Sequence, residues 1–243
     1  MNSLEKFNSY PEYESYTDLV KRVDPNKSPH IVTAIRASNP ISSSGKKLGI
    51  FSGSFNPLTL AHSKMVEKAY QDFELDEMLL LIAKANVDKP VFGWPIEARI
   101  LTLKLHSKNK SYISIAVSSH GRYIDKITAL KQIYPMHTEF YFIVGYDTLV
   151  RIFDPKYYNN IHEELDTLFS QCRFIVANRK GVSINDIKYF LNQPSFKSYQ
   201  RYIDFLTLSE YYANLSSTDI RNRINRGDEI SHLVPPSISY FLE

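Results

Sequence analysis

Residues 48–62 constrain the fold of this chain more than any other stretch. Their sequence, LGIFSGSFNPLTLAH, predicts a short buried strand, a tight turn of small residues and a helix that begins at Thr59. Gly53 lets the turn approach a ligand closely because glycine has no Cβ. The helix N-terminus offers unpaired N–H groups and a positive dipole end, and His62 in the first turn can add a hydrogen bond or a charge. This arrangement predicts a site for the phosphates of a nucleotide.

Short apolar segments alternate with amphipathic ones from residue 46 onward. We expect strands at residues 48–51, 78–84, 112–117, 139–144 and 173–177, and helices at 63–73, 96–106, 123–134 and about 161–170. This alternation predicts an α/β fold with a parallel, doubly wound sheet. Such sheets bind ligands at the carboxyl ends of their strands, at the switch point. The residues that follow predicted strands, and are expected at that edge, are Gly53, Lys89, Gly145, Asp147 and Arg179.

Residues 1–45 differ in pattern from the rest of the chain. A short helix is expected at 12–23 and a short strand at 30–35, while residues 36–45 are rich in Ser, Pro and Gly and predict a linker. No chemistry is apparent in this part. We therefore expect a single domain at residues 46–243, preceded by an N-terminal extension that is a packing appendage or a partly disordered arm.

The composition is that of a globular chain, since 43% of the 243 residues are hydrophobic and 13% are aromatic. The single cysteine, Cys172, excludes an intramolecular disulfide and favours a reducing compartment. The first residues lack the apolar core of a secretory signal, and the apolar run at residues 78–83 is far too short to cross a bilayer. We therefore expect an intracellular protein, in the cytoplasm or the nucleus or both, with no membrane partner.

Charge and motif content narrow the ligand further. The net charge of +3 comes from dispersed Lys and Arg residues, which suits a small polyanionic substrate and lacks the clustered stripe typical of nucleic-acid binding. One cysteine and no closely spaced His pair predict no structural zinc site and no metal ligands of the chain's own. The P-loop and G-x-G-x-x-G fingerprints are both absent from the sequence.

Two motifs resemble those of a known enzyme family. Residues 53–62, GSFNPLTLAH, are similar to the G-S-F-N-P-x-T-x-x-H motif of eukaryotic nicotinamide/nicotinate mononucleotide adenylyltransferases, members of the HxGH nucleotidylyltransferase superfamily. Thr59 and Ala61 replace the first histidine and the glycine of HxGH, so only His62 is kept. Residues 215–221, LSSTDIR, resemble the second family motif, I-S-S-T-x-I-R. Both motifs occur in the family's order and at its separation.

The resemblance implies a Rossmann-like fold and a reaction. AMP would pass from ATP to nicotinamide (or nicotinate) mononucleotide, which gives NAD or its deamido form and pyrophosphate. The cofactor implied is Mg²⁺, held mainly by substrate phosphates. Two alternatives stay open: another phosphate acceptor, as in cytidylyltransferases or pantetheine-phosphate adenylyltransferase, and an interaction protein that binds or hydrolyses ATP. Assembly into a homo-oligomer is also left open.

The resemblance assigns catalytic roles to His62 and Arg221. The expected ATP-binding residues are Ser52, Gly53, Ser54, Phe55, His62, Gly145, Asp147, Asn178, Arg179, Ser216, Ser217, Thr218 and Arg221. The expected mononucleotide-binding residues are Phe55, Lys89, Trp94, His120 and Tyr123, where His120 or Tyr123 would replace the aromatic residue that the family stacks on the pyridine ring.

Structural roles compete with these assignments at several positions. The hydroxyls of residues 216–218 and the carboxylate of Asp147 are also what helix N-caps require. Trp94 is equally an aromatic anchor for its loop. Arg99, which resembles an arginine of a further family segment, fits a functional and a structural role equally well.

Overall fold

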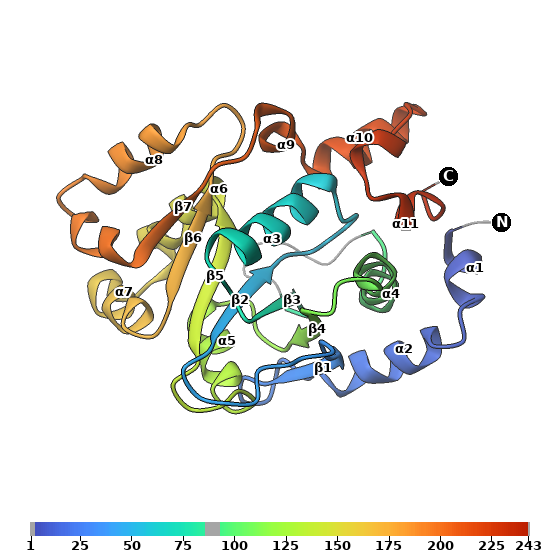
Figure 1. Cartoon of the computed structure of the whole chain (residues 1–243), viewed down its shortest axis with the longest axis horizontal. Coiled ribbons are helices and arrows are strands. Elements are labelled where there is room, and N and C mark those ends of the chain that lie inside the picture. Colours follow the sequence, from blue (N-terminus) through green and yellow to red (C-terminus); the bar gives the residue numbers. More distant parts are fainter. Residues whose placement is uncertain (1–2, 86–92, 243) are drawn as a thin grey trace.

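A seven-stranded sheet runs through the middle of the molecule (Figure 1). The computed structural model describes residues 3–85 and 93–242. The strands are β1 (Ile31–Ile35), β2 (Lys47–Ser52), β3 (Glu77–Ala83), β4 (Ile113–Ser118), β5 (Glu139–Gly145), β6 (Arg173–Ala177) and β7 (Ile203–Leu206). Their order across the sheet is β1-β4-β3-β2-β5-β6-β7, and every neighbouring pair is parallel except β1 and β4.

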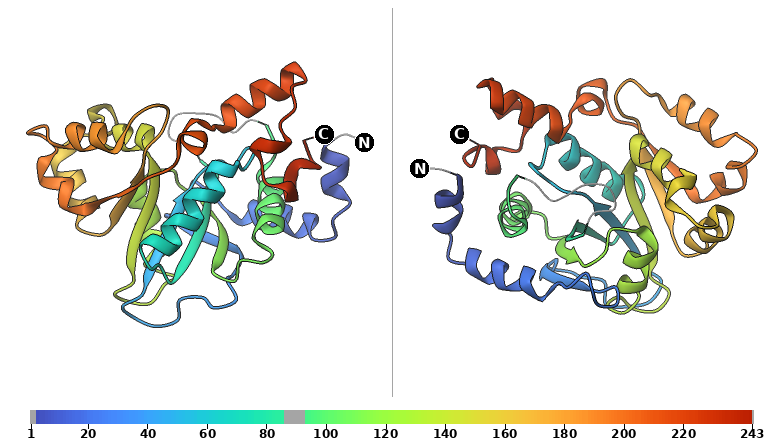
Figure 2. Two further views of the ribbon diagram at one scale, coloured as in Figure 1. Left: turned by 45° about the horizontal axis from the view of Figure 1, so that its top comes forward. Right: turned by 180° about the vertical axis from the view of Figure 1, so that it is seen from behind.

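Helices cover both faces of this sheet and form two separate cores (Figure 2). The first layer holds α1 (Ser3–Asn8), α2 (Tyr13–Arg22), α3 (Leu60–Asp72), α4 (Ile96–Ser107), α9 (Glu210–Asn214), α10 (Ser217–Arg226) and α11 (Pro236–Ser239). The second holds α5 (Tyr123–Leu130), α6 (Tyr146–Ile152), α7 (Ile161–Phe169), α8 (Ile184–Leu191) and the 3₁₀ turn η2 (Lys197–Tyr202). Two further 3₁₀ turns are η1 (Pro155–Tyr157) and η3 (Ser231–Leu233).

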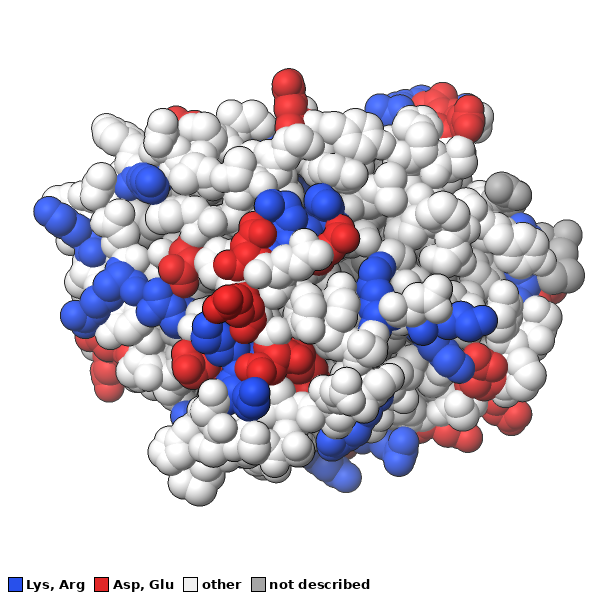
Figure 3. Space-filling model, viewed as in Figure 1, with Lys and Arg blue, Asp and Glu red and all other residues white. Residues whose placement is uncertain are grey.

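On the face seen in Figure 3, Lys and Arg side chains lie among Asp and Glu side chains. Within the described ranges, no helix combines the length and the apolar character that a membrane crossing requires.

The predicted doubly wound α/β fold is confirmed. The helix expected at 123–134 ends earlier, at Leu130, and the chain turns before Pro135, which disfavours helical backbone in the residue before it. The sequence pattern missed the short helices α1, α9 and α11, as well as α8 and β7. β7 is only four residues long, and Asp204 interrupts its apolar sequence, so it gives a weak strand signal.

The sheet changes its winding direction between β2 and β5. These two strands pair in parallel, with Phe51 opposite Ile143. The chain leaves β2 into α3 of the first layer but leaves β5 into α6 of the second layer. The crevice beyond their carboxyl ends is therefore the switch point, where sheets of this type bind ligands.

The N-terminal extension packs on the rest of the chain. β1 pairs with β4 at the edge of the sheet, with Val32 opposite Val117. In α1, the Phe7 ring stacks on Phe241 at 4.5 Å between centroids and meets Trp94 edge-on at 5.1 Å. The described part of the extension is thus an appendage built into the sheet and the first core, and the boundary at residue 46 stays a prediction.

A buried carboxylate joins the linker to the sheet. Glu77 on β3 is 1% exposed. It accepts hydrogen bonds from the backbone N–H of Ile41 at 2.7 Å, the hydroxyl of Ser114 at 2.5 Å and the hydroxyl of Tyr134 at 2.8 Å. One side chain therefore satisfies donors from three segments that are distant in sequence.

We expect Glu77→Ala to lower the free energy of unfolding by about 2–4 kcal/mol, because buried donors lose their acceptor. Urea unfolding measures this. Asp18→Ala removes an exposed ion pair with Lys21 and should leave stability close to that of the wild type. Equal losses in the two variants would contradict this role of Glu77.

Candidate active site

A cavity of about 660 Å³ opens at the switch point, over the ends of β2 and β5. One side of its wall comes from the turn after β2 and from helices of the first layer: Ser52, Gly53, Ser54, Asn56, His62, Arg99, Ser216, Ser217, Thr218 and Arg221. The other side comes from the second layer: Gly121, Arg122, Tyr123, Lys126, Arg151, Tyr157, Tyr158, Glu163 and Glu164. We call these the motif side and the second-layer side. Gly145, Asp147, Arg179 and Lys180 also line the cavity, after β5 and β6.

The orientation of His62 is set by a capping box at the start of α3. The Thr59 hydroxyl accepts from the His62 backbone N–H at 3.2 Å, and His62 Nδ1 accepts from the Thr59 backbone N–H at 3.1 Å. The ring lies edge-on to Phe55 and tilted against Phe51. The local sequence thus fixes one ring nitrogen on the backbone.

The His62 ring is neutral in this environment. Burial, and secondly the charge of Arg179, lower the pKa of His62 to about 3. Since Nδ1 accepts a backbone N–H, the single proton of the neutral ring sits on Nε2. His62 therefore offers an Nε2–H at the cavity wall.

The N-terminus of α10 joins the motif side from a distant part of the chain. Ser216 caps the helix by accepting from the Asp219 backbone N–H at 3.1 Å. The Ser217 hydroxyl donates to the Pro57 carbonyl at 2.9 Å, and Arg221 Nη1 donates to the Asn56 carbonyl at 2.6 Å. These contacts hold α10 against the turn after β2, so the two motifs form one surface.

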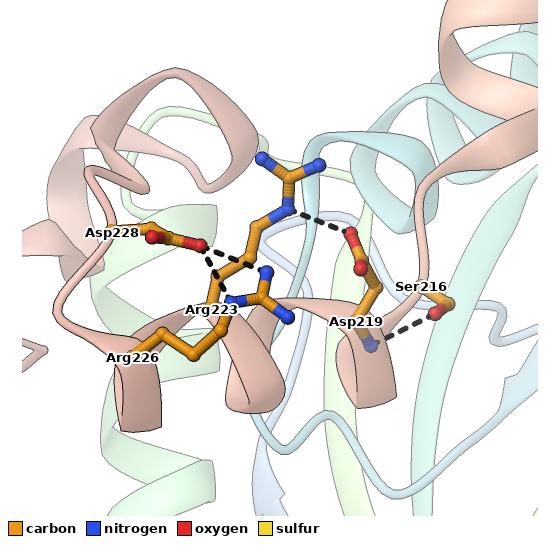
Figure 4. A network of polar contacts seen from close by, with 5 residues as sticks. All are labelled: Ser216, Asp219, Arg223, Arg226 and Asp228. Carbon is orange, nitrogen blue, oxygen red and sulfur yellow. Dashed lines mark hydrogen bonds and ion pairs between the residues drawn. The ribbon is translucent and has the colours of Figure 1, made fainter.

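The other arginines of α10 serve a different purpose. Arg223 pairs with Asp219 at 2.9 Å, and Arg226 pairs with Asp228 at 2.8 Å (Figure 4). Neither is among the cavity-lining residues. The arginine one turn into the helix, Arg221, is therefore the one that reaches the cavity.

Arg179 carries an unused donor at the cavity. Its Nη2 donates to the Leu215 carbonyl at 2.9 Å, while its buried Nε has no hydrogen-bond partner among the described residues. A Cβ on Gly145 would lie 3.0 Å from Arg179 Cγ, so the glycine makes room for this side chain. Asp147 lies in the first turn of α6, two residues after the cap position taken by Gly145, and its Oδ2 is 3.6 Å from Lys180 Nζ.

Arg99 is a further cation of the motif side and is 2% exposed. Its Nε donates to the Trp94 carbonyl at 2.7 Å and its Nη1 to the Ser54 carbonyl at 3.3 Å. Burial and the nearby charge of Arg221 lower its pKa to about 10. Arg99 thus positions the turn after β2 and also lines the cavity.

Four of the predicted site residues do not reach the cavity wall. The Phe55 side chain is 1% exposed and packs inward beneath Gly53. Asn178 donates to the Leu208 carbonyl and accepts from the Leu208 N–H, so its amide is used within the fold. Trp94 is an aromatic anchor against Phe7. His120 bonds the Ser119 hydroxyl at 2.8 Å and is not on the wall.

Two other residues, Lys89 and Tyr123, were also expected to bind the mononucleotide. Lys89 lies outside the described residues. Tyr123 lines the cavity, but its ring packs edge-on against Phe142 and Phe174, and Lys126 Nζ lies 4.9 Å from the ring centroid. The Tyr123 ring is therefore packed into the cavity wall, and its faces are not open for a ligand ring to stack on.

The sequence interpretation missed two aromatic residues of the second-layer side. Tyr157 and Tyr158 follow α6 and line the cavity. The Tyr158 hydroxyl donates to the Ile152 carbonyl at 2.5 Å, which fixes that ring. An available signal was the Tyr pair that follows shortly after the Gly145–Asp147 segment, since residues after a strand-end loop return to the same edge of the sheet.

A known protein family matches the part of the chain that forms this cavity. The family model described as "Cytidylyltransferase-like" matches residues 50–223, which include both motifs. The chain belongs to the cytidylyltransferase-like family. This agrees with the resemblance to the nucleotidylyltransferase superfamily seen in the sequence.

Individual relatives of the chain carry more specific names. The chain is 30% identical over 204 residues to a protein of Thermoanaerobacter sp. named "Probable nicotinate-nucleotide adenylyltransferase", covering 81% of this chain and 92% of that one. A protein of the same name from Fusobacterium nucleatum is 27% identical over 203 residues, covering 81% and 97%. A solved nicotinic acid mononucleotide adenylyltransferase of Plasmodium falciparum, complexed with NaAD, shares the fold with a TM-score of 0.62 at 20% identity, covering 81% and 95%.

We expect Arg221→Ala to weaken ATP binding by about 1.5–3 kcal/mol, through loss of a charge-assisted contact to phosphate. Calorimetric titration with ATP measures this. Arg221→Lys should recover only part, because an ammonium lacks the planar fork of a guanidinium. Arg226→Ala is the matched control on the same helix, and a comparable loss in that variant would refute the assignment.

Proposed function

We propose that this protein transfers the adenylyl group of ATP to nicotinate mononucleotide, giving the deamido dinucleotide and pyrophosphate. The observation that carries the proposal is the meeting of two helix N-termini, α3 and α10, with His62 and Arg221 at one cavity. Helix N-termini and guanidinium groups are suited to phosphates. The names of the relatives support the nicotinate form of the acceptor. The nicotinamide form, expected from the sequence resemblance, stays a prediction beside it.

ATP occupies the motif side in this proposal. Its triphosphate lies against the turn after β2, the N-terminus of α10 and the side chains of Arg221 and Arg99, all of which line the cavity. Its adenosine lies toward Gly145, Asp147 and Arg179, where the unpartnered Nε of Arg179 supplies a donor.

The mononucleotide occupies the second-layer side. Its phosphate must reach the α-phosphorus of ATP on the motif side, so its ring end points toward α5, α6 and η1. Tyr157 and Tyr158 are the aromatic rings there that suit a flat pyridine, since the Tyr123 ring packs edge-on against Phe142 and Phe174 in the core.

The chemical step needs positioning and charge stabilisation more than it needs a nucleophile from the protein. An oxygen of the acceptor phosphate attacks the α-phosphorus. The bond from that phosphorus to the oxygen that bridges it to the β-phosphorus breaks, and pyrophosphate leaves with the electron pair. The Nε2–H of His62 and the guanidinium of Arg221 stabilise the negative charge that grows on the phosphate oxygens.

Magnesium would reach the site bound to the triphosphate of ATP. Within residues 3–85 and 93–242, no group of three or more His, Cys, Asp or Glu side chains is arranged to hold a metal ion. The motif side carries arginines and hydroxyls, which suit phosphate oxygens. Mg²⁺ carried by the triphosphate and water fits this wall and neutralises part of the phosphate charge.

We expect His62→Ala to lower kcat by about 10²–10³-fold, the scale for losing one oriented donor to a developing charge. ATP affinity should change far less, because the donor acts mainly in the transition state. Steady-state kinetics and ATP titration measure the two effects. Thr59→Ala is the control: it removes the hydroxyl that caps α3 and should cost about 1 kcal/mol of stability, while the Nε2–H of His62 stays in place. A kcat of His62→Ala within threefold of the wild type would be incompatible with this role.

The reaction itself is tested by an acceptor screen. Purified protein with ATP and Mg²⁺ is offered nicotinate mononucleotide, nicotinamide mononucleotide and phosphopantetheine, and phosphocholine is offered with CTP. We expect pyrophosphate and a dinucleotide from the nicotinate form. If product forms with phosphopantetheine or phosphocholine but with neither mononucleotide, the acceptor assignment is wrong. Hydrolysis of ATP that does not depend on any acceptor would favour an interaction protein.

A further inference from the structure

A buried cation lies on the second-layer side of the cavity. Lys126 on α5 is 5% exposed and is one of the cavity-lining residues. Its Nζ donates to the Gly121 carbonyl at 2.7 Å and lies 4.9 Å from the centroid of the Tyr123 ring. The carbonyl and the ring together hold the ammonium in one place at the wall.

The ammonium keeps hydrogen-bonding capacity for a ligand. An ammonium has three N–H donors, and the bond to Gly121 is the one hydrogen bond that Lys126 Nζ makes within the described ranges. The nearby carboxylates on the wall are engaged elsewhere, since Glu164 pairs with Arg122 and Glu163 accepts from Asn160. A buried charge without a carboxylate partner is costly. The position therefore suits an anionic group that enters with a ligand.

The surroundings decide which end of the acceptor lies there. The acceptor phosphate must reach His62 and Arg221, which belong to the first layer. Lys126 belongs to α5, whose apolar side packs in the second core, together with the segment that carries Tyr158. The group that meets Lys126 is thus the end of the acceptor away from its phosphate, which is the pyridine ring and its substituent.

We propose that Lys126 is a specificity-determining residue that binds the ring carboxylate of nicotinate mononucleotide and so selects it over nicotinamide mononucleotide. This inference rests on the proposed function. The two acceptors share the ring, the ribose and the phosphate, and differ in a carboxylate against a neutral amide. An ammonium held at the wall distinguishes them because it binds the anion more strongly than the amide. Two charges act on Lys126 in opposite directions: the carboxylate of Asp125 on the same helix, and the guanidinium of Arg151 on α6, which also lines the wall.

The test compares both acceptors in variants of one helix. At saturating ATP, kcat/KM is measured with each mononucleotide for the wild type, Lys126→Met and Lys131→Met. Lys131 lies at the other end of α5, bonds Gln171 at 2.6 Å and is not on the cavity wall. We expect Lys126→Met to lower kcat/KM for nicotinate mononucleotide by about 10- to 100-fold, the value of one charge-assisted hydrogen bond. The value for nicotinamide mononucleotide should stay within about threefold, and Lys131→Met should match the wild type.

A second variant guards against a folding defect, because Lys126 is buried. Lys126→Arg keeps the charge and should retain more of the nicotinate preference than Lys126→Met does. ATP affinity and Tm are measured for each variant. A loss of ATP binding equal to the loss of nicotinate activity would overturn the inference, since it would show a general structural role.

The remaining outcomes separate this inference from the proposed function. Equal losses for both acceptors in Lys126→Met, or a wild type that prefers the nicotinamide form, would overturn the role of Lys126 and leave adenylyl transfer standing. No dinucleotide from the wild type with either acceptor would overturn the proposed function and this inference together.

Discussion

The parallel pairing of β2 with β5 is the constraint on which the site depends. Because the chain leaves these neighbouring strands toward opposite faces of the sheet, their carboxyl ends are left uncovered between the two helical layers. The motif after β2 then faces the residues that follow β5 without any loop having to reach over the sheet. A strand inserted between the two would separate the donors on the motif side from the rings on the second-layer side.

Several cations of the cavity share one mode of support. Four of them donate to main-chain carbonyls: Arg99 to Trp94 and Ser54, Lys126 to Gly121, Arg179 to Leu215 and Arg221 to Asn56. A carbonyl fixes the direction of a cation but does not neutralise it. On the outer side of α10, by contrast, Arg223 and Arg226 pair with carboxylates. Arg122 on the cavity wall is also paired, with Glu164, so the cations held only by carbonyls are a subset of those that line the cavity.

The sequence was most informative where the site is local. The turn, the capping box of His62 and the start of α10 are each encoded within a few residues, and their places at the strand ends follow from the winding of the sheet. A strand-end position does not reveal where its side chain points. Asn178 turns to Leu208 and Phe55 turns into the core, although both sit beside the cavity in sequence. Lys126 and the Tyr157–Tyr158 pair come from the second layer, and only the packed fold brings them opposite the motifs.

Gly145 and Arg179 form a coupled pair at the ends of β5 and β6. The glycine leaves the space that the arginine side chain fills, with a notional Cβ only 3.0 Å from Arg179 Cγ. A side chain at position 145 would therefore require the Arg179 side chain to shift or to be replaced by a shorter one. In related chains, we therefore expect the residues at these two strand ends to vary together, with a side chain at the first accompanied by a smaller residue at the second.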